Sequence, residues 1–225
     1  MRVAIAGGHG KIALHLTRLL RQRGDQVRSI IRNRDHAADI REAGGEPVVC
    51  DLEAVSEEEA AEAIVSANSV VFAAGAGPGS GPERKWTVDY GAAVKLIAAC
   101  NANGIRRYVL VSSIGADPAR EGDDTFDVYL RAKGQADVEL QASGLDYTIV
   151  RPVALTDDSG TGLVHIAERV ERGKIPREDV ASVLAAVLHE PGTARLTFEV
   201  TSGKTPVEEA IRAIARSASV SSPPG

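Results

Sequence analysis

The stretch that decides the fold is Val3-Ala4-Ile5-Ala6-Gly7-Gly8-His9-Gly10-Lys11-Ile12-Ala13, which passes from an apolar run through a glycine-rich turn into an amphipathic segment. This order predicts a strand over Val3–Ala6 and a helix over Lys11–Arg23. Gly7 permits the sharp turn out of the strand, and Gly10 lets a ligand approach the backbone. Because free N–H groups at a helix start attract anions, the sequence predicts a nucleotide diphosphate here.

Composition sets limits on the class of protein. The chain has 225 residues, with 26 basic and 31 acidic side chains and a net charge of −5. Without a long basic run, nucleic acid is not an expected ligand. The first residues already belong to a strand and no apolar run could span a bilayer, so we expect a cytoplasmic protein without a membrane anchor. Cys50 and Cys100 are far apart and are predicted to be buried thiols.

Short apolar runs alternate with helical segments along the chain. This pattern predicts an α/β fold, a doubly wound Rossmann-type parallel sheet with helices on both faces. We expect a single domain over 1–216, small substrate-side elements within 153–205, and a flexible tail at 217–225. Ser56 and Glu59 are predicted to form a capping box. The main predicted strands are 3–6, 26–32, 46–50, 69–74, 107–112, 146–151 and 196–201, and the main helices are 11–23, 88–103, 125–143, one starting at Pro176, and 206–216.

The end of the second predicted strand indicates the type of dinucleotide. An acidic residue there binds the ribose hydroxyls of NAD, whereas an arginine accommodates the 2′-phosphate of NADP. This chain has Arg32-Asn33-Arg34 and no carboxylate at that point. The sequence therefore favours NADP(H), with NAD(H) as the alternative. A plainer interpretation is two solvated loop arginines.

Two further strand ends are expected to complete the nucleotide site. Asp51-Leu52 follows the third strand, where the Asp51 carboxylate can accept a hydrogen bond from the adenine amino group or serve only as a turn residue. Ala73-Ala74-Gly75 follows the fourth strand and offers a backbone floor for the ribose and the diphosphate. The full set of expected cofactor contacts is Gly7, His9, Gly10, Lys11, Ile12, Arg32, Asn33, Arg34, Asp51, Leu52, Ala73, Ala74, Gly75, Ser112, Lys133, Pro152 and Val153.

Several motifs occur together in a familiar order. After the glycine loop and Asp51-Leu52 come the stretches 111–117 (VSSIGAD), 129–133 (YLRAK) and 146–152 (DYTIVRP). In this order the chain resembles the atypical short-chain dehydrogenases/reductases, of the NmrA-like and epimerase-like kind, over roughly residues 2–215. The resemblance implies a Rossmann-type domain that binds NADP(H), in a group whose members commonly match only part of the catalytic set.

The candidate catalytic residues follow from their chemistry. Tyr129 and Lys133 are four residues apart, so on a helix they share a face, and the ammonium group would stabilise the phenolate. Ser113 would polarise the same substrate oxygen that Tyr129 protonates. Asp89 stands where the related dehydrogenases have an asparagine, and a carboxylate cannot donate a hydrogen bond. Asp89 is therefore expected either to pair with Lys133 or to cap its own helix.

The substrate side is less well specified. The stretch 75–82 is glycine-rich and is either a mobile lid or a long solvated connection, and the stretch 155–162 is expected to cross the mouth of the pocket. Trp86 is interpreted as a ring beside the nicotinamide or as an ordinary core or surface residue. His9 and His165 are interpreted as neutral loop or sheet residues. No cluster has metal-ligand spacing, so we predict no metal.

Three functions agree with these patterns. The first is an NADPH-dependent oxidoreductase that reduces a small carbonyl, quinone or flavin through Ser113, Tyr129 and Lys133. The second is a sugar-type epimerase or dehydratase that retains its cofactor. The third is a non-catalytic, NADP(H)-sensing regulatory protein of the NmrA-like kind. In each case we expect a monomer or a homodimer, and for the two enzymes a small-molecule substrate.

Overall fold

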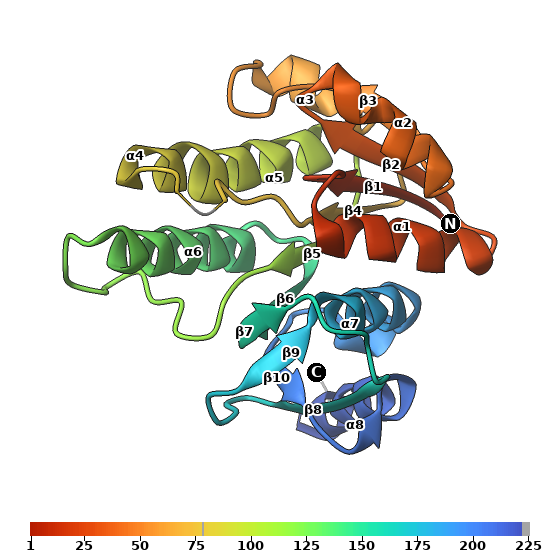
Figure 1. Ribbon diagram of the computed structural model, residues 1–225, viewed down its shortest axis with the longest axis vertical. Helices are drawn as coiled ribbons and strands as arrows, with labels where there is room; N and C mark the ends of the chain where they lie inside the picture. Colours follow the sequence, from red (N-terminus) through yellow and green to blue (C-terminus); the bar gives the residue numbers. More distant parts are fainter. Residues whose placement is uncertain (78, 222–225) are drawn as a thin grey trace.

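The computed structural model describes residues 1–77 and 79–221, and its centre is a mostly parallel sheet flanked by helices (Figure 1). The strands are β1 (Arg2–Ala6), β2 (Gln26–Ile31), β3 (Glu46–Val49), β4 (Ser69–Phe72), β5 (Arg107–Val111), β6 (Asp146–Pro152), β7 (Ala154–Thr156), β8 (Leu163–Ala167), β9 (Lys174–Pro176), β10 (Leu196–Ser202) and β11 (Thr205–Pro206). The helices are α1 (Lys11–Gln22), the 3₁₀ helix η1 (Arg34–His36), α2 (Ala37–Glu42), α3 (Glu57–Ala63), α4 (Pro82–Arg84), the π-helix η2 (Lys85–Ala92), α5 (Ala93–Ala102), α6 (Thr125–Ala142), α7 (Arg177–His189), the 3₁₀ helix η3 (Pro191–Thr193) and α8 (Val207–Ser221).

The order of the strands confirms the predicted doubly wound Rossmann-type sheet. Strands β3-β2-β1-β4-β5-β6-β10 are neighbours in that order, and each adjacent pair is parallel. The chain begins at β1, winds outward through β2 and β3, and then returns to wind the other way through β4, β5 and β6. Because these strands are parallel, their carboxyl ends lie along one edge of the sheet, where the order reverses between β1 and β4.

Each face of the sheet buries its own apolar layer. Helices α1, α7 and α8 cover one face, while α3, α5 and α6 cover the other (Figure 1). Strand β1 shows why both layers form, because successive side chains point to opposite faces. Val3 and Ile5 belong to the first layer, whereas Ala4 and Ala6 belong to the second. All four are fully buried, so β1 is a central strand covered on both sides.

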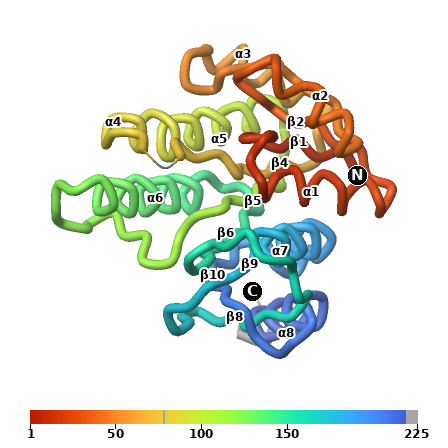
Figure 2. Tube along the Cα trace, in the orientation of Figure 1, coloured from red at the N-terminus to blue at the C-terminus, as the bar shows by residue number. Residues whose placement is uncertain are grey.

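The C-terminal elements extend the sheet beyond what the sequence predicted. Figure 2 shows the trace of β8 and β10 on the side of β6 away from β5. Strand β8 runs antiparallel to β10, and β11 pairs antiparallel with β8, so the sheet ends in an antiparallel edge. Strands β7 and β9 form a separate two-stranded parallel sheet. The sequence predicted only one strand after β6, because strands of two or three residues carry no readable periodicity. Within the expected substrate-side segment, 153–205, strands β8 and β10 therefore belong to the central sheet.

Two helix boundaries also differ from expectation. The sequence predicted one helix from Val88 to Asn103, but the structure starts it earlier, with α4 and then the π-helix η2, before α5. A wider π turn leaves no separate signal in an apolar pattern. Helix α8 continues to Ser221, so the predicted tail is helical over 217–221, and 222–225 lie outside the described residues.

Candidate functional site

The turn after β1 brings the glycine loop against the end of β4. Gly7 has a φ of +75°, a left-handed conformation, and a Cβ placed on it would lie 2.6 Å from the Cα of Ala74. The N–H of Gly10 donates to the carbonyl of Gly7 at 2.8 Å and closes the turn. Both the conformation and the close approach require glycine at position 7. The turn therefore lies directly beside the expected floor at Ala73–Gly75.

Helix α1 begins without a capping side chain. Gly10 is its N-cap residue, and its first turn holds no acidic side chain. Other helices are capped from within the chain: Ser56 and Glu59 form the predicted capping box on α3, and Asp124 accepts from two N–H groups at the start of α6. The first N–H groups of α1 are therefore left for an external acceptor, which is the arrangement that binds a phosphate.

A cleft of about 340 Å³, here called the glycine-loop cleft, lies at the carboxyl ends of β1, β2, β3 and β4. Its lining includes most of the cofactor contacts expected from the sequence: Gly7, His9, Gly10, Arg32, Asp51, Leu52, Ala73, Ala74 and Gly75. Eight other expected contacts are not in its lining: Lys11, Ile12, Asn33, Arg34, Ser112, Lys133, Pro152 and Val153. The donor set fits a bound dinucleotide, because the glycine backbone at the start of α1 and the guanidinium of Arg32 line the same cleft.

Two of the expected contacts outside the cleft, Asn33 and Lys11, have other partners. Asn33 accepts a hydrogen bond from the N–H of Asp35 and caps η1, so its side chain serves local structure. The Nζ of Lys11 lies 2.5 Å from Asp157 in the loop after β7, and Arg177 lies 2.7 Å from the same carboxylate. The hydrogen bond from Lys11 and the nearby Arg177 lower the pKa of Asp157. These pairs tie the 155–162 loop to α1 and α7.

Several cleft residues were not predicted from the sequence. Arg84 donates to both oxygens of Glu53, at 3.3 and 2.7 Å, and with the Thr87 hydroxyl it lowers the pKa of that carboxyl. His36 also lines the cleft and stacks on His9, an expected contact, with ring centroids 3.6 Å apart, and His9 in turn lies 2.7 Å from Asp39. These residues come from separate elements, so no local motif could have joined them. Cys50, expected to be buried, is half-buried and lines the cleft.

A second cavity of about 490 Å³, here called the tyrosine cavity, adjoins the glycine-loop cleft. Ala73, Ala74 and Gly75, just after β4, line both the cleft and the cavity. The two hollows therefore meet at this point of the chain. The tyrosine cavity contains Tyr129 and Lys133 from α6 and Asp89 from η2. Ile12 and Ser112, expected as cofactor contacts, line this cavity instead of the cleft. The two hollows together form one trough along the carboxyl edge of the sheet.

Lys133 is held in a buried network at the base of the tyrosine cavity. It is 3 % exposed, its Nζ donates to the carbonyl of Val111 at 3.0 Å, and it lies 3.4 Å from Asp89. Burial alone would lower the pKa of Lys133, but the Asp89 carboxylate, with Tyr129 and Asp137, outweighs burial and raises it. Asp89 also accepts from the N–H of Ala76 at 3.1 Å. The sequence predicted that Asp89 either pairs with Lys133 or caps its own helix, and in the structure it pairs with Lys133.

A second buried carboxylate lies one turn further along α6. Asp137 is 1 % exposed and accepts from Ser112 at 3.0 Å and from Arg151 at 2.9 Å. Burial raises the pKa of Asp137, although Arg151 and Ser112 act in the opposite direction. The structure brings Ser112 to the cavity, whereas the hydroxyl of Ser113 donates to the carbonyl of Ile114 and does not line it. Ser113, the serine expected from the sequence, therefore does not meet Tyr129 in this lining.

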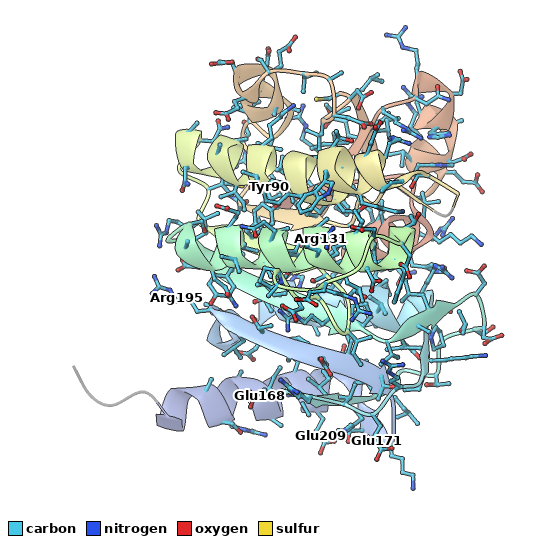
Figure 3. All side chains as sticks on the ribbon, turned by 90° about the vertical axis from the view of Figure 1, so that its left-hand side faces the viewer. Tyr90, Arg131, Glu168, Glu171, Arg195 and Glu209 are labelled. Carbon is cyan, nitrogen blue, oxygen red and sulfur yellow. The ribbon has the colours of Figure 1, made fainter. Side chains whose placement is uncertain are left out.

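The π-helix η2, which precedes α5, also contributes to the lining of the tyrosine cavity. Trp86 is 36 % exposed, packs edge-on against Tyr90 at 5.8 Å and lines neither hollow. Tyr90 in turn reaches α6, where its hydroxyl lies 3.4 Å from Glu139 (Figure 3). His165 lies in β8, away from both hollows, as a sheet residue. A π-helix at this point is a frequent feature of functional sites.

Two kinds of feature are absent from the described residues. Over residues 1–77 and 79–221, no group of three or more His, Cys, Asp or Glu side chains is placed to hold a metal ion. Within the same residues, every helix is too short or too polar to cross a bilayer.

Comparison with known proteins places these features in a family. Residues 7–191 match the model of a family described as NAD(P)H-binding. The "Uncharacterized sugar epimerase YhfK" of Bacillus subtilis is 37 % identical over 94 % of this chain and 99 % of its own length. Two solved structures are also similar. A "Putative NAD-dependent epimerase/dehydratase" from Bacillus halodurans has a TM-score of 0.88 and 37 % identity, covering 95 % of this chain and 99 % of its own. The oxidoreductase ylbE from Lactococcus lactis has a TM-score of 0.84 and 26 % identity, covering 96 % and 97 %.

Proposed function

The chain belongs to the NAD(P)H-binding family, and from that premise we propose that it is an NADPH-dependent oxidoreductase that reduces a small carbonyl, quinone or flavin. One observation carries the proposal: the glycine-loop cleft and the tyrosine cavity meet at Ala73–Gly75. A dinucleotide along the cleft would thus end beside Tyr129 and Lys133. A binding protein without chemistry has no need of that tyrosine and that buried lysine together.

The residues of the tyrosine cavity would divide the proton chemistry among them. When bound, a reduced nicotinamide supplies a hydride to the substrate. The hydroxyl of Tyr129 gives a proton to the substrate oxygen, which balances the reduction of a carbonyl to an alcohol, and takes a proton back from solvent. The ammonium of Lys133 stabilises the phenolate left behind, while Asp89 holds that ammonium in place. Because Lys133 and Asp89 are both buried, water is excluded from this part of the cavity.

The preference for NADPH rests on Arg32. It lines the glycine-loop cleft, it is exposed, and among the described residues it forms no salt bridge. Its guanidinium is therefore free to bind the 2′-phosphate with two parallel hydrogen bonds. Arg34 is two residues away but does not line the cleft, which makes it a matched control.

The first experiment is titration calorimetry of the protein with NADPH and with NADH. Arg32→Ala should weaken NADPH binding at least tenfold and leave NADH binding unchanged, while Arg34→Ala should change neither by more than about twofold, since each good bidentate contact is worth roughly 1.5–3 kcal/mol. Equal loss in both variants would mean that general positive charge, not a contact by Arg32, attracts NADPH.

The second experiment separates chemistry from binding. Tyr129→Phe should abolish turnover of NADPH with a panel of quinones, flavins and carbonyls but leave NADPH affinity unchanged, because only the proton donor is lost. An unchanged rate would remove Tyr129 from the mechanism. Binding of NADPH without any turnover by the original protein would favour the sensor function instead.

A second candidate function comes from the relatives. Two proteins at 37 % identity carry epimerase names, which favours a sugar-type epimerase or dehydratase with a retained cofactor. Such an enzyme oxidises and restores its cofactor within one turnover. Release of a stoichiometric dinucleotide on denaturing the purified protein, without net consumption of NADPH, would support this candidate over the reductase.

A further inference from the structure

The tyrosine cavity contains a buried lysine that the proposed chemistry does not use. Lys85, the first residue of η2, is 8 % exposed. Its Nζ donates to the carbonyl of Gly77 and to the hydroxyl of Ser80, each at 2.9 Å, and lies 5.7 Å from the centre of the Tyr129 ring. All of these partners are neutral. Over residues 1–77 and 79–221, no carboxylate lies within 4 Å of this ammonium group.

Lys133 in the same cavity and Lys11 at the start of α1 differ from Lys85 in this respect. Lys133 has Asp89 at 3.4 Å, and Lys11 has Asp157 at 2.5 Å. A buried charge without a counter-ion is unfavourable, because the low-dielectric surroundings do not replace the water it has lost. An ammonium group has three N–H donors, and the third of Lys85 has no acceptor in the part of the chain that the structure describes. Lys85 therefore presents both a charge and a donor to the cavity.

The other residues that line the cavity indicate the chemistry of the rest of the ligand. Ile12, Val111 and Leu155 supply apolar surface. Phe126 is 60 % exposed, and its ring lies roughly parallel to that of Tyr129, with centroids 6.0 Å apart. An exposed aromatic ring at a cavity wall is a surface on which a flat, conjugated molecule can stack.

We infer that the substrate of this protein is a planar, conjugated molecule that carries an anionic group, a carboxylate, sulfonate or phosphate, bound by Lys85. This inference rests on the proposed reductase function and narrows its substrate class. The ring system packs between the apolar wall and Phe126, and the anion supplies the missing counter-ion. Lys85 also holds Gly77 and Ser80, so the ligand would contact the glycine-rich loop through the same ammonium.

The test compares pairs of molecules that share a ring and differ in charge. Riboflavin and FMN differ by one phosphate, and 1,2-naphthoquinone and its 4-sulfonate differ by one sulfonate. Equilibrium binding of each is measured to protein saturated with NADP⁺, whose own binding is established first by calorimetry. We expect the anionic member of at least one pair to bind at least tenfold more tightly than the neutral member. Lys85→Met should reduce this preference to less than twofold, and Lys85→Arg should restore it.

A matched control is available in the same chain. Lys95 donates to the carbonyls of Leu52 and Val55 and lines neither hollow, so Lys95→Met removes a carbonyl-binding lysine without touching the cavity. It should leave the preference unchanged. Equal binding of the neutral and anionic members, binding of neither pair, or a preference that survives Lys85→Met would overturn the inference. Each of these results is distinct from failure to bind NADP⁺ at all, which would instead overturn the proposed function.

Discussion

The glycine-loop cleft and the tyrosine cavity lie side by side at one edge of the sheet but are built by opposite means. The cleft depends on atoms that are missing: Gly7 has no side chain to meet Ala74, and α1 has no capping side chain. The cavity depends on charges that are present and buried, notably Lys85, Asp89 and Lys133. A site of the first kind is sensitive to added atoms, and a site of the second kind is sensitive to removed charges.

The largest effect should follow from removing one charge of the cavity. Lys133→Met leaves Asp89 buried without its partner at 3.4 Å, and we expect a loss of about 3–5 kcal/mol in the free energy of unfolding. Urea unfolding of the protein without ligand measures it. The double variant Lys133→Met with Asp89→Asn should recover at least half of the loss, because it removes the orphaned charge. A loss below about 1 kcal/mol in the single variant would show that water reaches this pair.

The next effect should follow from adding one atom to the cleft. Gly7→Ala places a Cβ 2.6 Å from the Ala74 backbone at a φ of +75°, whereas Gly24→Ala has a similar φ of +85° with nothing within 4 Å. Both variants carry the cost of a left-handed alanine, about 1–2 kcal/mol, and only the first adds a clash. Thermal unfolding and NADPH calorimetry should show greater destabilisation and loss of binding for Gly7→Ala alone. Equal behaviour would mean that the loop moves away from β4 at little cost.

The same contrast explains which features could be predicted from sequence. The strand–glycine–helix order, the parallel sheet and the capping box of Ser56 and Glu59 depend on residues close together in the chain, so their patterns are readable. The antiparallel strand β8 and the π-helix η2 were missed because their form depends on what they pack against. The burial of Lys85, with no carboxylate within 4 Å among the described residues, is likewise a product of tertiary packing.

The two serines after β5 show what a sequence motif can predict about a site and what it cannot. The sequence places Ser112 and Ser113 at the right strand end, but adjacent residues in an extended segment point to opposite sides. Only the structure tells which one faces the cavity, and its lining includes Ser112. The role of Arg32 and that of Tyr129 stay predictions, because the motif names the residues but not their ligand.

A smaller effect distinguishes these serines. Ser112→Ala removes a hydrogen bond to the buried Asp137, and we expect a loss of about 1–1.5 kcal/mol in stability together with lower turnover. Ser113→Ala should cost about 0.5 kcal/mol or less and leave turnover within twofold, since the hydrogen bond that its hydroxyl makes among the described residues is to the carbonyl of the next residue, Ile114. Urea unfolding and steady-state kinetics of the two variants make the comparison. A larger loss of turnover in Ser113→Ala than in Ser112→Ala would support the catalytic role that the sequence predicted for Ser113.

The smallest effect tests a charged pair in the lining of the cleft, Glu53 with Arg84. Arg84 and Thr87 lower the pKa of Glu53 below its ordinary value of 4.5. A carboxyl whose pKa is lowered in the folded state adds stability above its unfolded pKa and loses it as the pH falls through the folded value. Glu53→Gln should therefore lower stability by about 0.5–1 kcal/mol at pH 7, and the difference from the original protein should shrink steadily below pH 4.5. Urea unfolding at pH 7 and at successively lower pH measures it, and a difference independent of pH would assign the effect to the shape of the side chain. In that case the rim of the cleft, like its centre, would depend on shape and not on charge.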